Sequence, residues 1–283
     1  MRGLHLAGIV AVTVLTSTAG AARAEGGFVL MASTIGPIDA GIVPLLEERF
    51  ELETGVRVRH VGAGTGEALK ISEKGAVDLV LVHARKLEEK FVRDGFGTER
   101  IPLMYNDFVI VGPKADPAGI RSKGIGEALA AIAVKGARFV SRGDRSGTHV
   151  AEMDLWAAAG LKPAGAWYEV YEKGSEGNSA TLKHADQRQA YTLIDRATWL
   201  SLRKGLDLAV LVEKDEALLN FISLIPVSPR RFPKVNHQGA MAFATWLTAP
   251  TKGQKVIRDF GKDRYGEPLF FPDSREWRSA QKK

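Results

Sequence analysis

Short apolar runs alternate with helical patterns along this chain, and this alternation limits the fold more than any other feature. Residues 28–31 are apolar and lead through a Gly-Pro turn into apolar side chains at helical spacing up to Phe50. Residues 56–61 alternate between apolar and polar side chains, as in a half-buried strand, and residues 76–82 are a further short apolar run. Each of the two segments is followed by a polar loop and a helical pattern. Strands that alternate with helices predict a mainly parallel sheet covered by helices on both faces.

A second set of the same kind follows the turn-rich segment 116–119, where we expect the chain to cross into another lobe. A strand over 138–140, a polar loop and a helix from Thr148 repeat the order of the first set. The apolar run 218–227 predicts a strand that crosses back. The predicted class is α/β, with two lobes that are joined by two crossover segments, and each lobe is a mainly parallel sheet flanked by helices. We expect lobe 1 to comprise residues 25–112 and 222–283, and lobe 2 to comprise residues 113–221.

The N-terminus predicts export. Arg2 precedes an apolar run from Leu4 to Leu15, and small residues then end at Ala24, which is typical of a cleaved signal peptide over residues 1–24. The apolar run is shorter than the ~20 residues that span a bilayer, although a retained anchor is the alternative interpretation. The chain has no cysteine, which excludes a lipoprotein anchor, thiol chemistry and disulfides. We therefore expect a periplasmic protein.

Charge and histidine spacing exclude other classes. Lysine and arginine number 39 against 33 acidic residues, and the two signs are interleaved rather than gathered in runs. This pattern does not favour a nucleic-acid surface, but it is compatible with a small anionic ligand. The histidines are scattered without the spacing of a metal site, so we expect neither a metal nor a cofactor.

The segment 141–149, which we call the 141–149 loop, concentrates hydroxyls, glycines and arginines between a strand and a helix. The first N–H groups of a helix lack partners and carry the positive end of its dipole, so they bind anions. Arg142 would add a planar set of donors that suits a tetrahedral oxyanion. The alternative is an ordinary capped helix, in which Ser146 or Thr148 is the cap and Asp144 pairs with an arginine.

Two other loops strengthen the interpretation as an anion site. Ser33-Thr34 and Gly64-Thr65-Gly66 also lie between a predicted strand and a predicted helix. Ligands in α/β proteins bind beyond the carboxyl ends of the strands, where such loops meet. The three loops offer donors and almost no acids, as expected for a site that surrounds an anion.

A hydrolase is the weakest alternative. Asp144, Ser146 and His149 have the residue types of a catalytic triad, but they are crowded into one loop and no Gly-x-Ser-x-Gly motif is present. Triad members normally come from separate segments. We therefore expect a protein that is not an enzyme.

Several consecutive segments together resemble a known family. They are residues 64–70, 78–84, 105–113, the 141–149 loop and residues 190–196. In these segments the chain is similar to the periplasmic tungstate-binding proteins of Tup-type ABC transporters, which are type II periplasmic binding proteins. The resemblance implies a tetrahedral dianion, tungstate or molybdate, held without a cation by hydroxyls, backbone N–H groups and one arginine. It also implies an ABC permease in the inner membrane as the partner.

The chain departs from the family at one place in the first lobe. Where the family has three threonines and a serine after its opening strand, this chain reads Ser33-Thr34-Ile35-Gly36. Loss of one hydrogen bond to a buried anion costs on the order of 1.5–3 kcal/mol of binding free energy, so the sequence leaves alternatives to tungstate as the ligand. A small organic acid held by Arg142 and Arg145 is one alternative, and a sensor for a membrane receptor is another.

The resulting prediction is a periplasmic, monomeric substrate-binding subunit of an ABC importer that captures an oxyanion between its lobes. Closure of the lobes would remove water from the anion, and the size of the enclosed space would select among tetrahedral dianions. The predicted ligand-binding residues are Ser33, Thr34, Thr65, Arg142, Ser146, Gly147 and Thr148.

Overall fold

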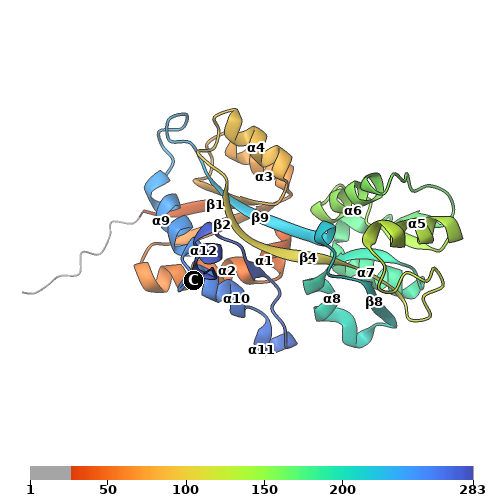
Figure 1. Ribbon diagram of the computed structural model, residues 1–283. Helices are drawn as coiled ribbons and strands as arrows, with labels where there is room; N and C mark the ends of the chain where they lie inside the picture. The colour runs from red at the N-terminus through yellow and green to blue at the C-terminus, as the bar shows by residue number, and fades with distance from the viewer. Residues whose placement is uncertain (1–26, 283) are drawn as a thin grey trace, which may run out of the picture.

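The computed structural model describes residues 27–282, and the predicted signal peptide lies outside these residues. Figure 1 shows two lobes joined by two long strands, β4 (Ile101–Pro113) and β9 (Leu219–Pro226). The expected two-lobed α/β class with two crossover segments is confirmed. No helix in the described part of the chain is both long and apolar enough to cross a bilayer.

The first lobe is built on β1 (Val29–Thr34), which lies parallel to and between β2 (Val58–Ala63) and β3 (Leu79–Val82). All four residues of β3 are buried, as expected for a strand that is covered on both faces. The remaining strand β10 (Phe271–Pro272) pairs with β4. The helices of this lobe are α1 (Ile35–Asp39), α2 (Ile42–Thr54), α3 (Thr65–Ser72), α4 (Arg85–Arg93), α9 (His237–Thr248), α10 (Gly253–Asp259), α11 (Lys262–Tyr265) and α12 (Arg275–Ala280).

The crossing into the second lobe takes place inside β4. Residues 101–107 of this strand pair antiparallel with β9, whereas residues 108–113 pair antiparallel with β7 (Thr192–Asp195) and β8 (Leu208–Val212). The turn-rich segment 116–119, where the sequence suggested the crossing, therefore lies within the second lobe. One continuous strand therefore belongs to both lobes, and its side chains are buried almost throughout. The exact division of the chain between the lobes stays a prediction.

The second lobe repeats the strand-to-helix order of the first. Strands β5 (Phe139–Ser141) and β6 (Tyr168–Val170) are parallel. Phe139 packs edge-to-face on Trp156, with ring centroids 5.3 Å apart, and both side chains are fully buried. This aromatic cluster fixes the end of β5, from which the 141–149 loop starts. The helices of the lobe are α5 (Ile125–Lys135), α6 (Gly147–Ala158), α7 (Asn178–Gln187) and α8 (Arg196–Leu202).

Candidate functional site

The two predicted loops of the first lobe lie at the carboxyl ends of adjacent strands. Thr34 is opposite Ala63 in the β1–β2 register, and Thr65 follows Ala63 by two residues. Thr34 precedes α1 and Gly64 precedes α3, so both loops are helix starts. The β-sheet register thus brings together loops that are thirty residues apart in the sequence.

Thr34 and Thr65 carry the strongest sign of a ligand site. The Oγ1 atoms of both threonines are buried without a hydrogen-bond partner, and only three other side-chain atoms among residues 27–282 share that condition. A buried polar group without a partner costs about 1–3 kcal/mol. Ser33 differs, because its Oγ donates to the Thr34 carbonyl oxygen at 3.1 Å. Two unsatisfied hydroxyls at neighbouring strand ends favour a polar guest that accepts hydrogen bonds.

Arg142, by contrast, is held by its own lobe. Its Nε donates to the Gly174 carbonyl oxygen at 3.1 Å, its Nη1 donates to Asn178 Oδ1, and its Nη2 pairs with Asp144 at 2.9 Å. A methyl group on Gly174 would lie 1.7 Å from the Arg142 carbonyl oxygen, so this close approach requires glycine. The guanidinium is therefore fixed in one position, and it retains N–H groups beyond the three contacts.

The start of α6 fits the capped-helix interpretation as well as the anion interpretation. Ser146 Oγ accepts from the His149 backbone N–H at 3.4 Å, and the Ser146 N–H donates to Asp144 Oδ1 at 3.0 Å. The Arg145 N–H donates to His149 Nδ1 at 2.9 Å. The backbone N–H groups of Gly147 and Thr148 stand in the first turn, where a helix offers no partner.

Two acids near Arg142 were missed by the sequence analysis. Asp39 ends α1 in the first lobe, and Asp195 caps α8 in the second. Burial raises the pKa of Asp39, the charge of Asp195 raises it further, and Arg142 opposes both effects. Asn178, which accepts from Arg142, donates to Asp195 Oδ2 at 2.6 Å. The charges of Asp195 and Arg142 both act on Asp39, so acids accompany the donors in this region.

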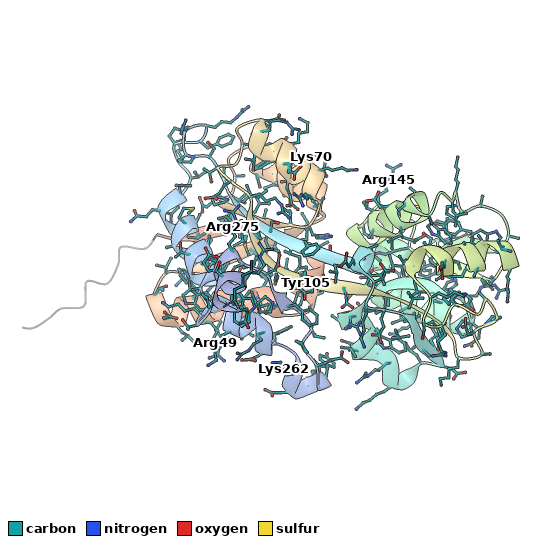
Figure 2. All side chains as sticks on the ribbon, in the orientation of Figure 1. Arg49, Lys70, Tyr105, Arg145, Lys262 and Arg275 are labelled. Carbon is teal, nitrogen blue, oxygen red and sulfur yellow. The ribbon has the colours of Figure 1, made fainter. Side chains whose placement is uncertain are left out.

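Cationic side chains also flank the space between the lobes. Figure 2 shows Lys70 of α3 on one side and Arg145 of the 141–149 loop on the other. Both are exposed, and Lys70 has only a solvent-screened pair with Glu67 at 3.6 Å. Exposed positive charge on both sides of this space attracts anions from solution.

A buried carboxyl lies behind the 141–149 loop. Glu152 of α6 is 3 % exposed, and its Oε1 accepts from Tyr168 Oη at 2.6 Å and from Trp156 Nε1 at 3.3 Å. Burial raises the pKa of Glu152 to about 7, although these hydrogen bonds favour the ionised form. No sequence pattern indicated this group, since an acid on a helix normally faces water.

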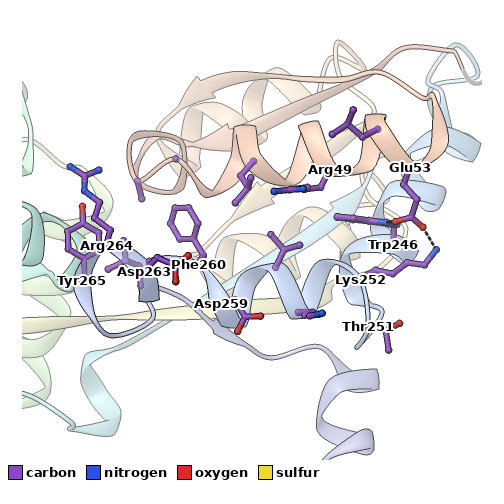
Figure 3. A pocket seen from close by; sticks show the side chains of 18 residues that line it. Arg49, Glu53, Trp246, Thr251, Lys252, Asp259, Phe260, Asp263, Arg264 and Tyr265 are labelled. Carbon is purple, nitrogen blue, oxygen red and sulfur yellow. Dashed lines mark hydrogen bonds and ion pairs between the residues drawn. The ribbon is translucent and has the colours of Figure 1, made fainter.

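One hollow of the described surface lies apart from these loops. A groove of about 930 Å³ runs between α2 and α10, where Glu53 pairs with Lys252 beside Trp246 (Figure 3). None of the predicted ligand-binding residues lines it. Within residues 27–282 no three His, Asp or Glu side chains are arranged to hold a metal ion.

Comparisons with known proteins agree with this arrangement. A sequence model described as the PBP superfamily domain matches residues 16–251. The tungstate-binding protein TupA of Peptoclostridium acidaminophilum is 40% identical over 251 residues, which are 88% of this chain and 86% of the relative. A putative ABC transporter anion-binding protein of Haloferax volcanii is 42% identical over 250 residues, covering 86% of this chain and 71% of the relative.

Solved structures point the same way. The tungstate-binding protein TupA of Desulfovibrio alaskensis G20 superposes with a TM-score of 0.80 at 40% identity, over 88% of this chain and 100% of the other. Its likeness extends through both lobes. The superfamily model matches most of the sequence, and the solved relative shares the two-lobed fold. The chain therefore belongs to the PBP superfamily.

Proposed function

We propose that this protein is the periplasmic substrate-binding subunit of an ABC importer, and that it binds a tetrahedral oxyanion, tungstate or molybdate, between its lobes. Relatives over most of the chain are named for tungstate or anion binding, and one is named for an ABC transporter. On this proposal residues 1–24 direct export and are removed, residues 25–112 with 222–283 form lobe 1, and residues 113–221 form lobe 2. The mature protein acts as a monomer that delivers its anion to a membrane permease and performs no catalysis.

One observation carries the proposal. The buried hydroxyls of Thr34 and Thr65 have no partner, and they stand at strand ends of the lobe that faces Arg142 and the start of α6. An oxyanion accepts hydrogen bonds through every oxygen, so one guest would satisfy both hydroxyls. Ser33, Thr34 and Thr65 would form one wall, and Arg142, Ser146, Gly147 and Thr148 the other. Lobe closure would replace the water around the anion by these fixed donors.

A second candidate ligand is a small organic acid. Ile35 is 50 % exposed at the start of α1, and a methyl group on Gly36 would meet nothing within 4 Å. Apolar surface and free space at the same helix start favour a ligand that has a carbon skeleton beside its carboxylate. Arg142 and Arg145 would then hold the carboxylate oxygens.

Calorimetric titration of the mature protein tests both candidates. We expect one-to-one binding of tungstate and molybdate, with sulfate and phosphate weaker because the enclosed space fits the larger anions. A panel of small carboxylates separates the second candidate, since the better ligand also raises the melting temperature more. Absence of heat with all four oxyanions would overturn the proposal, and binding of a carboxylate alone would replace it by the second candidate.

A further inference from the structure

His83 and Gly147 form a close contact between the two lobes. His83 directly follows β3 in the first lobe, and Gly147 is the first residue of α6 in the second. A methyl group on Gly147 would lie 2.3 Å from Cε1 and 2.9 Å from Nε2 of the His83 ring. The ring therefore rests against the backbone of the helix start, with no room for even the smallest side chain.

Conformation does not explain the glycine at position 147. Gly147 is not among the residues with positive φ, so its backbone is one that any residue adopts. Ser146 already caps the helix, so the glycine does not serve as the cap. The remaining physical reason for glycine here is the approach of the imidazole from the other lobe.

The ring is held from behind by the crossing strands. Asn220 of β9 lies beside the His83 side chain, and its Nδ2 donates to Asn106 Oδ1 of β4 at 2.7 Å. Asn106 and Asn220 are opposite each other in the β4–β9 register. Burial lowers the pKa of His83, and the neighbouring Asn220 opposes this only in part, which favours the neutral imidazole. A neutral ring meets the positive end of the α6 dipole without charge repulsion.

We propose that the His83 ring, seated on Gly147, is the stop that sets how far the cleft closes and thereby which size of oxyanion fits. The size selection rests on the proposed function, whereas the stop itself does not. The contact lies at the start of α6, whose backbone N–H groups would bind the guest under the proposed function. The thickness of the contact would therefore fix the distance between the two walls. A packed interface of this kind adopts discrete positions rather than a continuum.

Two measurements on the same variants test the stop. The chain has no cysteine, so Lys70→Cys and Val150→Cys, both exposed, accept spin labels on α3 and α6 without competing sites. Pulsed dipolar spectroscopy then reports the separation of the lobes with and without tungstate. Calorimetry of the same proteins without the labels reports the relative affinities for tungstate, molybdate and sulfate.

Gly147→Ala should lengthen the distance between the labels and lower tungstate affinity about tenfold, which is ~1.4 kcal/mol. Adding His83→Ala to Gly147→Ala should restore the short distance, because the methyl group then has room. His83→Ala alone should permit deeper closure and raise sulfate affinity relative to tungstate. Gly126→Ala is the matched control, because Gly126 lies at the start of α5 and its added methyl group would meet nothing within 4 Å.

The stop is overturned if Gly147→Ala matches Gly126→Ala in label distance, or if His83→Ala fails to reverse the effect. If Gly147→Ala does not fold, His83→Ala alone tests the stop, by its label distance and by its affinity for sulfate relative to tungstate. A wild-type protein that binds no oxyanion removes the proposed function and the size selection, while the label distances still test the stop.

Discussion

The two walls of the cleft are built in opposite ways. In the first lobe the Thr34 and Thr65 hydroxyls are buried without partners, whereas in the second lobe Arg142 is fixed by Gly174, Asn178 and Asp144. The first wall therefore lowers the stability of the free protein, and a ligand would recover the loss. The second wall holds its charge in place before any ligand arrives, which reduces the reorganisation needed on binding. Affinity and stability should thus respond differently to changes in the two lobes.

The largest expected effect comes from the second wall. Arg142→Ala removes the fixed positive charge but leaves Asp144, Asp39 and Asp195, so we expect tungstate affinity to fall at least a hundredfold, about 3–5 kcal/mol. Arg142→Lys keeps the charge without the planar donors and should lose less. Arg138→Ala is the control, because Arg138 is an exposed arginine of the same lobe that donates only to the Arg188 carbonyl oxygen. Equal titration curves for Arg142→Ala and Arg138→Ala would show that Arg142 does not touch the ligand.

The first wall should show an opposite sign in stability. Thr34→Val and Thr65→Val each remove a buried hydroxyl that has no partner, so the free protein should gain about 1 kcal/mol in its free energy of unfolding. Affinity for tungstate should fall about ten- to a hundredfold, because a hydrogen bond to a charged group contributes about 1.5–3 kcal/mol.

Thr181→Val is the matched control for these variants. Thr181 is equally buried, but its Oγ1 donates to the Gly177 carbonyl oxygen at 3.1 Å. This variant should lose stability and keep its affinity. Denaturant unfolding and calorimetry measure both quantities, and a loss of stability in Thr34→Val would contradict the account of the first wall.

Restoring hydroxyls should enlarge the contribution of the first wall to the free energy of ligand binding. Gly36→Ser fits the open space at that position, and Ile35→Thr replaces an exposed apolar side chain. We expect the double variant to bind tungstate up to about tenfold more tightly, since one added hydrogen bond to a charged group contributes about 1.5 kcal/mol or more. Gly126→Ser, at an open helix start of the second lobe, should leave the titration unchanged. If the wild type binds a carboxylate more tightly than it binds tungstate, the organic acid is favoured as the ligand instead.

The smallest effect on affinity is expected behind the second wall, where Glu152 makes stability depend on pH. Burial raises the pKa of Glu152 from 4.5 to about 7, so the protonated form stabilises the fold below about pH 4.5 and this contribution is lost as pH rises through 7. Glu152→Gln should remove that loss and be more stable than wild type by about 1–3 kcal/mol at pH 8. Unfolding curves from pH 4 to 8 measure this, with the exposed Glu127→Gln as control. An unchanged pH profile in Glu152→Gln would contradict the assignment.

Local pattern predicted the order of strands, loops and helices, because apolar spacing and helix starts are properties of neighbouring residues. The start of α6 at the 141–149 loop is an example. The sequence did not indicate that the buried strand β4 continues through both lobes, because no turn marks the boundary. Partners from distant segments could not be read from spacing, as the contact of Arg142 with Asn178, 36 residues later, illustrates.

The same limit applies to His83. Its residue type carries no signal for a contact with Gly147, because the two belong to different lobes and meet only in the folded chain. Conversely, the sequence indicated that Thr34 and Thr65 lie between a strand and a helix, but only the structure shows that their hydroxyls lack partners.

The central claim is that both walls contact a single anion. Crystals of the mature protein grown with tungstate, measured at the tungsten absorption edge, locate the metal directly by its anomalous scattering. We expect one strong peak between Thr34 Oγ1 and the Arg142 guanidinium, with the Thr65 hydroxyl also in contact. A peak bound by one lobe alone, or one in the groove between α2 and α10, would contradict it.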